Sequence, residues 1–304
     1  MAPNLLWALA RPVAVMLVLA LPGTAWSEDC TVDLAPPAAA KVSSHGLRIG
    51  VALGSGSAHG LAHIGVIQEL EALDLDVDVV TGTSVGSLFG ALWASGLSGA
   101  EIERIARDAD WIDSSQIAFS TQGLYTNAPL QKKLETILRK PIEAWPKRFA
   151  AVATNLANGH RQLLASGSGA LAVQASSAIP AYFRPVVIDG AKLADGALVE
   201  PVPVDAARAL GADFVIAVDV AYRPYEDTVT GATQYAFQAM HILVNALAEQ
   251  QLRTADVAIR LDLHRTLTAC GRDALIAEGR QALRRAAPHI AQALALAAER
   301  RSRR

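Results

Sequence analysis

The chain has 304 residues, of which 52% are hydrophobic and 18% are charged, and its formal net charge at pH 7 is −2. This composition is typical of a packed globular protein and excludes a disordered chain. The slightly negative charge argues against a dedicated nucleic-acid binder, which needs a basic surface to contact phosphates.

The N-terminus predicts a secretory signal. An apolar run over residues 13–21 follows a basic residue, is too short to span a bilayer, and ends at a Pro-Gly pair. Small residues at Ala25 and Ser27 favour cleavage after Ser27. We therefore expect residues 1–27 to be a signal peptide and the protein to be exported, most simply to the periplasm. An uncleaved membrane anchor and a misassigned start codon are the alternatives.

Residues 28–45 contain a Pro-Pro pair and an alanine run and are expected to form an extended arm. The only two cysteines are Cys30, in this arm, and Cys270. In an oxidising compartment the two could form a disulfide, although a pair so distant in sequence could equally stay unbridged.

The globular fold is expected to begin with a buried strand over residues 47–53. A glycine-rich loop, Gly54–Gly60, follows, and apolar residues spaced by three then predict a helix over 61–73. A loop of this kind can point several backbone amides at one place, as an oxyanion hole requires. The loop residues that could contribute are Ser55, Gly56, Ser57, Ala58, His59 and Gly60.

The same loop invites comparison with a dinucleotide-binding loop, whose pattern is G-x-G-x-x-G followed by an acid such as Asp76 or Asp78. Here Gly54, Gly56 and Gly60 leave one residue too many before the last glycine. The dinucleotide hypothesis also leaves the next motif of the chain without a role.

Ser84 lies at the centre of the pattern expected for a nucleophile. A β-branched run over 77–81 predicts a buried strand, an apolar pattern from Val85 onward predicts a helix, and Gly82-Thr83-Ser84-Val85-Gly86 joins them. So tight a turn needs glycine on both sides of its centre, because a Cβ there would collide with the turn. The hydroxyl would then lie at a helix N-terminus, where developing negative charge is favoured. Alternatively, the two glycines only allow close packing of strand and helix.

The rest of the chain alternates strands and helices. We expect a helix from residue 98, a surface connection or a cover over 111–127, a strand over 148–154 with a hairpin partner over 161–164, a short helix over 169–178, a hairpin over 186–193, a strand over 213–219, a helix over 232–253, a strand over 257–263, and helices to the end. This order predicts a single α/β domain with a central, mostly parallel sheet sandwiched between helices in three layers. Residues 46–222 would form its catalytic core, and the helical portion 223–304 would pack on the same domain.

Arginines recur towards the C-terminus, at 280, 284, 285, 300, 301, 303 and 304. Such a basic stretch could make a peripheral contact with anionic lipid head groups. The simpler interpretation is a solvated helix end whose positive charge faces the helix dipole.

Two residues could act as the base for Ser84. His264 follows a predicted strand and is the best candidate for a Ser–Asp–His triad. Asp195 stands in Asp195-Gly196-Ala197, at a predicted strand end followed by a tight turn, and a buried carboxylate can serve as base if burial raises its pKa. Asp189, before Gly190, is better explained as a hairpin-turn residue.

Three motifs together resemble those of bacterial patatin-like phospholipases. They are the glycine-rich stretch Leu53–Val66, the elbow Gly82–Gly86 and Asp195–Ala197, and the stretch Ala175-Ser-Ser-Ala-Ile-Pro180 supports them. The likeness runs from about Leu47 to Asp219. It implies a patatin-like three-layer fold and hydrolysis of fatty-acyl esters of phospholipids or other lipids, with no metal, no organic cofactor and no nucleic acid; the sequence identifies no protein partner.

The resemblance also implies roles for individual residues. Ser84 would be the nucleophile, Asp195 the base of a Ser–Asp dyad, and amides near Gly56 and Ser57 the oxyanion donors. The family commonly has glycine where Ser57 stands and Lys or Arg where His59 stands. These departures keep open a catalytically silent, lipid-binding protein of the same fold.

Overall fold

The computed structural model describes residues 41–107, 116–117, 125–221, 231–261 and 271–303. The strands are β1 (Ile49–Leu53), β2 (Val77–Thr83), β3 (Gln116–Ile117), β4 (Tyr125–Thr126), β5 (Arg148–Asn155), β6 (Arg161–Leu164), β7 (Val186–Ile188), β8 (Ala191–Asp195), β9 (Phe214–Asp219) and β10 (Val257–Arg260). The helices are α1 (Ala62–Ala72), α2 (Val85–Ala94), α3 (Gly99–Arg107), α5 (Ala128–Ile137), α6 (Gly169–Ser176), α7 (Val204–Ala209), α8 (Ala232–Leu252) and α9 (Gly271–Ser302), with short 3₁₀ turns η2 (Ser57–Leu61), η3 (Ile142–Ala144) and η4 (Gly196–Leu198).

One eight-stranded sheet organises the molecule, in the order β10-β9-β1-β2-β5-β8-β7 with β6 also paired to β5. The five strands from β10 to β5 are parallel. Strand β6 is antiparallel to β5, and β7 to β8, because tight turns at Gly159 and Gly190 send each hairpin straight back. Strand β8 also pairs antiparallel with β5. The expected α/β fold with a mostly parallel sheet is confirmed.

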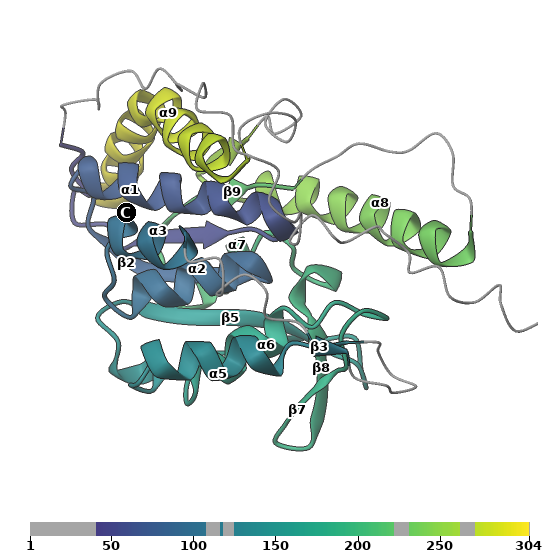
Figure 1. Ribbon diagram of the computed structural model, residues 1–304. Helices are drawn as coiled ribbons and strands as arrows, with labels where there is room; N and C mark the ends of the chain where they lie inside the picture. The colour runs from purple at the N-terminus through teal and green to yellow at the C-terminus, as the bar shows by residue number, and fades with distance from the viewer. Residues whose placement is uncertain (1–40, 108–115, 118–124, 222–230, 262–270, 304) are drawn as a thin grey trace, which may run out of the picture.

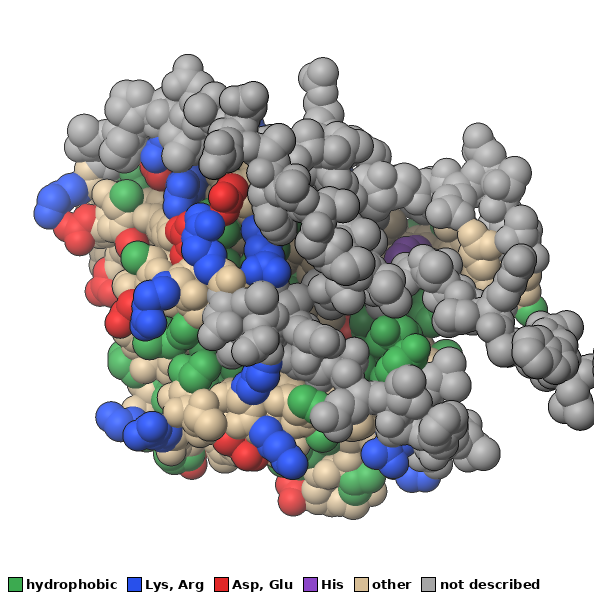
Figure 2. All heavy atoms as spheres, in the orientation of Figure 1, with side chains coloured by type: hydrophobic (Ala, Val, Ile, Leu, Met, Phe, Trp, Pro, Cys, Tyr) green, Lys and Arg blue, Asp and Glu red, His purple; other side chains and the backbone are tan. Residues whose placement is uncertain are grey.

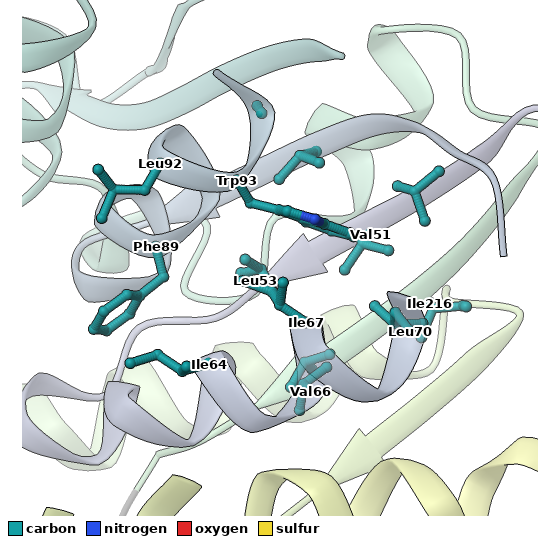
Figure 3. Packing of buried hydrophobic residues seen from close by; sticks show 14 of the residues in the cluster. Val51, Leu53, Ile64, Val66, Ile67, Leu70, Phe89, Leu92, Trp93 and Ile216 are labelled. Atoms are coloured by element: carbon teal, nitrogen blue, oxygen red, sulfur yellow. The ribbon is translucent and has the colours of Figure 1, made fainter. Parts of the chain in front are cut away.

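The pleat of the central strand separates the two helical layers. Val51 and Leu53 of β1 belong to the larger core, with residues of α1, α2 and α9. Figure 3 shows the two side chains between those of α1 and those of α2. Ala52 between them points to the other face, where it packs with residues of α7 and α8. This alternation along a strand gives the three-layer sandwich.

The C-terminal helix α9 lies across α1 on the outside of this sandwich (Figure 1). The two helices cross closely because the contact is made by glycines: a Cβ on Gly65 would collide with the backbone of α9, and one on Gly279 with the backbone of α1. Next to the crossing, Arg284 forms a largely buried ion pair with Glu69 at 2.8 Å. Helix α9 thus packs on α1, and β10 adds a strand to the sheet beside β9.

Candidate active site

Ser84 occupies the sharp turn between β2 and α2. Its backbone has φ 55° and ψ −124°, a strained conformation for a residue with a side chain. The glycines on either side are sterically required: a Cβ on Gly82 would collide with the backbone of Gly86, and one on Gly86 with the carbonyl oxygen of Leu53. The nucleophile-elbow geometry expected from the sequence is therefore present, with Ser84 at the N-cap of α2.

Asp195 reaches Ser84 across strand β5. Thr83, just before Ser84, pairs with Val152 of β5, and Asp195, the last residue of β8, pairs with the adjacent Ala153. Because β8 runs antiparallel to β5, its end comes level with the end of β2. A Cβ on Gly196 would collide with the Val152 carbonyl, so the chain can turn away directly after Asp195 only with glycine there.

The Ser84 hydroxyl approaches the Asp195 carboxylate closely enough to lower its pKa by hydrogen bonding. The backbone amide of Ala197 also donates a hydrogen bond to the carboxylate, at 2.9 Å from Asp195 Oδ1. Asp195 is 4% exposed. Burial raises the pKa of its carboxyl from 3.8 to about 6, against the opposing effect of these two hydrogen bonds. At neutral pH the group is mostly ionised yet poised to accept a proton.

The glycine-rich loop lies beside the elbow. Its first two residues are held by backbone hydrogen bonds: the Gly54 amide donates to the Val218 carbonyl at 2.9 Å, and the Ser55 amide donates to the Pro201 carbonyl at 2.8 Å. Within the described part of the chain, the next two amides, of Gly56 and Ser57, have no acceptor. Amides left without a partner beside a serine are suited to receive a developing oxyanion.

Close packing and an unusual backbone hold this loop in shape. A Cβ on Gly56 would come within 2.8 Å of the Val220 carbonyl oxygen, and one on Gly60 would collide with Val85 of the elbow helix. Ser57 has φ 49°, in the left-handed region that favours glycine. This conformation explains why glycine is common there in the family; Ser57 adopts it with strain. Ala58 lies half-buried in the same turn, η2.

Both histidines of the loop region are neutral. Burial lowers the pKa of His59, while a hydrogen bond with the Gly56 backbone opposes the shift. The family's positive charge at this position is therefore not supplied by His59 at neutral pH. His63 is fully buried, its pKa lowered by burial to about 4, and its Nε2 donates to the Gly54 carbonyl at 2.8 Å. This hydrogen bond anchors the glycine-rich loop to α1.

Ser176 is a supporting residue to which the sequence assigned no role. It is fully buried, its Oγ accepts a hydrogen bond from the Ser84 amide at 2.9 Å, and it donates to the Val152 carbonyl at 2.6 Å. Ser176 thus fixes the strained elbow to β5. The same strand pairs with β8, which ends at Asp195. Its place in the stretch Ala175–Pro180 was the only signal for it.

The segment Val199–Val202, just after the Asp-Gly-Ala turn, links all parts of the site. Thr83 donates to the Glu200 carbonyl at 2.7 Å, which ties the segment to the elbow. The Pro201 carbonyl accepts the Ser55 amide, which ties it to the glycine-rich loop. From α8, the side chain of Gln251 accepts from the Val202 amide at 2.9 Å and donates to the Val199 carbonyl at 3.2 Å.

Other residues singled out in the sequence are not brought to the site. Asp189 lies in the exposed turn between β7 and β8, with φ 49°. Asp78 accepts the Ile49 amide at the start of β1, the opposite end of the strand from the glycine-rich loop, so it does not serve as a ribose-binding acid. His264, Cys30, Cys270 and the predicted signal peptide lie outside the described residues.

Comparison with known sequences agrees with this geometry. The profile of the family described as Patatin-like phospholipase matches residues 51–208, more than half of the chain. The chain is 30% identical over 201 residues to "Lysophospholipase NTE1" of Pyricularia oryzae, covering 61% of this chain and 13% of that protein. It is 33% identical over 192 residues to an uncharacterised NTE family protein of Mycobacterium bovis, covering 60% of this chain and 52% of the other.

A human relative, "Patatin-like phospholipase domain-containing protein 6", is 31% identical over 196 residues, covering 61% of this chain and 14% of that protein. The chain therefore spans about half or less of the length of these relatives. Among solved structures, VipD from Legionella pneumophila is similar with a TM-score of 0.47 and 17% identity, covering 77% of this chain and 65% of that one. The matched region contains the glycine-rich loop, the Ser84 elbow and Asp195, and the chain belongs to the patatin-like phospholipase family.

Proposed function

We propose that the protein is a serine acylhydrolase that cleaves fatty-acyl ester bonds of phospholipids or other lipids. The observation that carries this proposal is the pairing of Ser84, at a strained elbow, with Asp195, a buried carboxylate that Ser84 approaches and whose pKa is raised to about 6. Membership of the patatin-like phospholipase family supports a lipid ester as the substrate class.

The first half of the reaction would transfer the acyl group to the protein. Ser84 gives its hydroxyl proton to Asp195 as its oxygen attacks the ester carbonyl, and the Gly56 and Ser57 amides hold the oxyanion, helped by the N-terminus of α2. When the tetrahedral intermediate collapses, the ester C–O bond breaks. The proton on Asp195 passes to the departing alcohol, which for a phospholipid is the lysolipid.

The second half would release the fatty acid. Water gives a proton to Asp195 and attacks the acyl-serine, the same amides stabilise the second oxyanion, and the proton returns to Ser84 as the bond to its oxygen breaks. Because His59 is neutral at pH 7, the oxyanion is stabilised by the amide donors and the helix dipole and not by a fixed positive charge beside it.

The test is labelling and turnover of the wild type and two serine variants. Ser84→Ala should abolish both labelling by a fluorophosphonate probe and hydrolysis of a panel of phospholipid, lysophospholipid and short-chain esters. Ser95→Ala is the matched control, because Ser95 caps the other end of α2, where its hydroxyl donates to Leu92. If the Ser84→Ala variant keeps label or activity, the nucleophile is elsewhere.

Two other functions would give different results in the same assays. A Ser–Asp–His esterase would lose its activity in His264→Ala, whereas a dyad enzyme would keep it. The approach of Ser84 to Asp195, close enough to affect the pKa of the carboxyl, favours the dyad. A catalytically silent lipid-binding protein would retain an acyl chain on purification and turn over no ester. The strained Ser57 and the neutral His59 are the features that favour this second alternative.

We further propose that the chain is exported to the periplasm, on the strength of the apolar run over residues 13–21. Cell fractionation and N-terminal sequencing of the product test this, with a start at Glu28 expected. Non-reducing mass spectrometry of the same product tests whether Cys30 and Cys270 are bridged. A peripheral contact with a membrane belongs to the same proposal, since the substrate would lie in one.

A further inference from the structure

Helix α8 turns apolar side chains outward. In Figure 1 one end of α8 lies against the body of the molecule and the other projects away from it. On this helix Tyr235, Ile242 and Leu243 are 68%, 46% and 71% exposed. They are three of the six large hydrophobic side chains exposed in the described part of the chain, so exposure of this kind is concentrated on α8.

These side chains form one stripe along the helix. We name it the α8 stripe: Tyr235, Ala239, Ile242, Leu243 and Ala246, spaced by four, three, one and three residues. That spacing keeps all five on one face of an α-helix. The opposite face is partly polar, since Asn245 and Gln251 are buried there with Ala248 and Leu252. The helix thus departs from the usual pattern of a surface helix, because its outward face is apolar as well.

Charged residues are excluded from most of this helix. The sequence has no Asp, Glu, Lys or Arg from residue 232 to residue 248. In Figure 2 blue and red side chains gather over the body of the molecule, and the visible part of the projecting helix carries neither colour. A face without charges can enter the boundary between lipid head groups and acyl chains at little desolvation cost. None of the described helices combines the length and hydropathy needed to cross a bilayer, so α8 would lie along the surface.

The helix that carries the α8 stripe is anchored beside the candidate active site. At the buried end of the helix, Gln251 holds the segment Val199–Val202 by two hydrogen bonds. This segment in turn contacts the elbow through Thr83 and the glycine-rich loop through Ser55. At a rise of 1.5 Å per residue, Leu243 lies only about 12 Å along the helix from Gln251. The stripe is therefore carried close to the point where α8 is anchored beside the site.

We propose that the α8 stripe docks on the surface of a neutral lipid bilayer and brings the catalytic dyad next to its ester substrate. This inference rests on the proposed function, which places the substrate in such a bilayer. Because the stripe carries no charge, docking should not require anionic lipid and should not weaken as salt is added. This separates it from a contact made by the arginines near the C-terminus, which would need both anionic lipid and low salt.

The test compares full-length variants in flotation with phosphatidylcholine vesicles. The pair Ile242→Ser and Leu243→Ser should weaken vesicle binding by about 30-fold or more, because two large side chains leave the interface. Leu296→Ser, on α9, is the matched control: Leu296 is similarly exposed, at 45%, and lies outside the stripe. Every variant retains residues 13–21, so any binding through that run is common to all.

Hydrolysis of a water-soluble short-chain ester is measured in parallel. The double variant should keep this rate and lose hydrolysis of vesicle phospholipid, while Leu296→Ser keeps both. Equal vesicle binding by the double variant and the wild type would overturn the docking proposal, as would an equal loss in Leu296→Ser.

Analytical ultracentrifugation without lipid supplies a second decisive outcome. If the wild type is a dimer and the double variant a monomer, the stripe is a contact between copies of the chain and the proposal fails. If the wild type hydrolyses no ester at all, the proposed function fails, and vesicle binding alone still decides whether the stripe docks on lipid.

Discussion

Replacing Asp195 by asparagine should stabilise the protein at neutral pH while it removes the base. Burial raises the pKa of the Asp195 carboxyl from 3.8 to about 6. Because of this pKa difference, the ionised Asp195 lowers the free energy of unfolding by about 3 kcal/mol at pH 7. Asparagine is neutral, retains an oxygen for the Ala197 amide and can still contact Ser84. We expect most of this free energy to be recovered, with ester hydrolysis slowed by about 10²–10⁴-fold.

The pH dependence of the gain follows from the same pKa. Folded Asp195 holds its proton up to about pH 6, whereas the unfolded group releases it near 3.8, so the wild type loses stability from this group as pH rises between the two values. Urea unfolding should show Asp195→Asn more stable than the wild type at about pH 7.5 and nearly equal to it at about pH 4. Protonation of the buried His63 at low pH affects both proteins alike.

Asp213→Asn is the matched control, since the same substitution should act in the opposite direction. Hydrogen bonds from Arg48 lower the pKa of Asp213 to about 2. Its ionised form therefore stabilises the fold above about pH 4, and this contribution is lost as pH falls towards 2. Asp213→Asn should be less stable than the wild type at neutral pH. If Asp195→Asn were also less stable there, or its gain were the same at about pH 4, the reasoning on Asp195 would be refuted.

Substitutions at three further residues test the parts that support the site. Ser57→Gly should raise the free energy of unfolding by about 0.5 kcal/mol, because φ 49° is unstrained for glycine; a lower value in thermal unfolding would contradict this. His63→Leu should lower it by about 2 kcal/mol, because the Gly54 carbonyl loses its donor, and His63→Gln should recover part of the loss; equal losses would remove the role given to the hydrogen bond. Ser176→Ala should lower kcat by about tenfold with KM unchanged, since the Ser84 amide loses its acceptor; a change in KM alone would argue against positioning.

The parts of the site that depend on local sterics could be predicted from the sequence. Gly82 and Gly86 stand two residues to either side of Ser84, and only glycine fits there, so the elbow could be identified from a few residues. The tight turn at Asp189-Gly190 is similarly local, and its Asp was correctly separated from the candidate base. Asp195 was favoured mainly by its Asp-Gly-Ala motif, because a carboxylate at a strand end is common.

Contacts between distant segments could not be predicted in the same way. The position of Asp195 depends on β8 running antiparallel to β5, which is decided by strand pairing and not by the sequence of β8. Ser176 and Gln251 act through hydrogen bonds to residues dozens of positions away. In α8, periodicity finds the helix but cannot say which face is buried, because both faces carry apolar residues.

The rate at which a fluorophosphonate labels Ser84, measured by mass spectrometry across the pH range, tests the central claim most directly, because it reports proton transfer from Ser84 without depending on any lipid. The account predicts a rate that rises through an apparent pKa of about 6, the value of Asp195, and labelling of Asp195→Asn that is slow at every pH. Labelling of Asp195→Asn at the wild-type rate, or an unchanged pH profile in that variant, would contradict it.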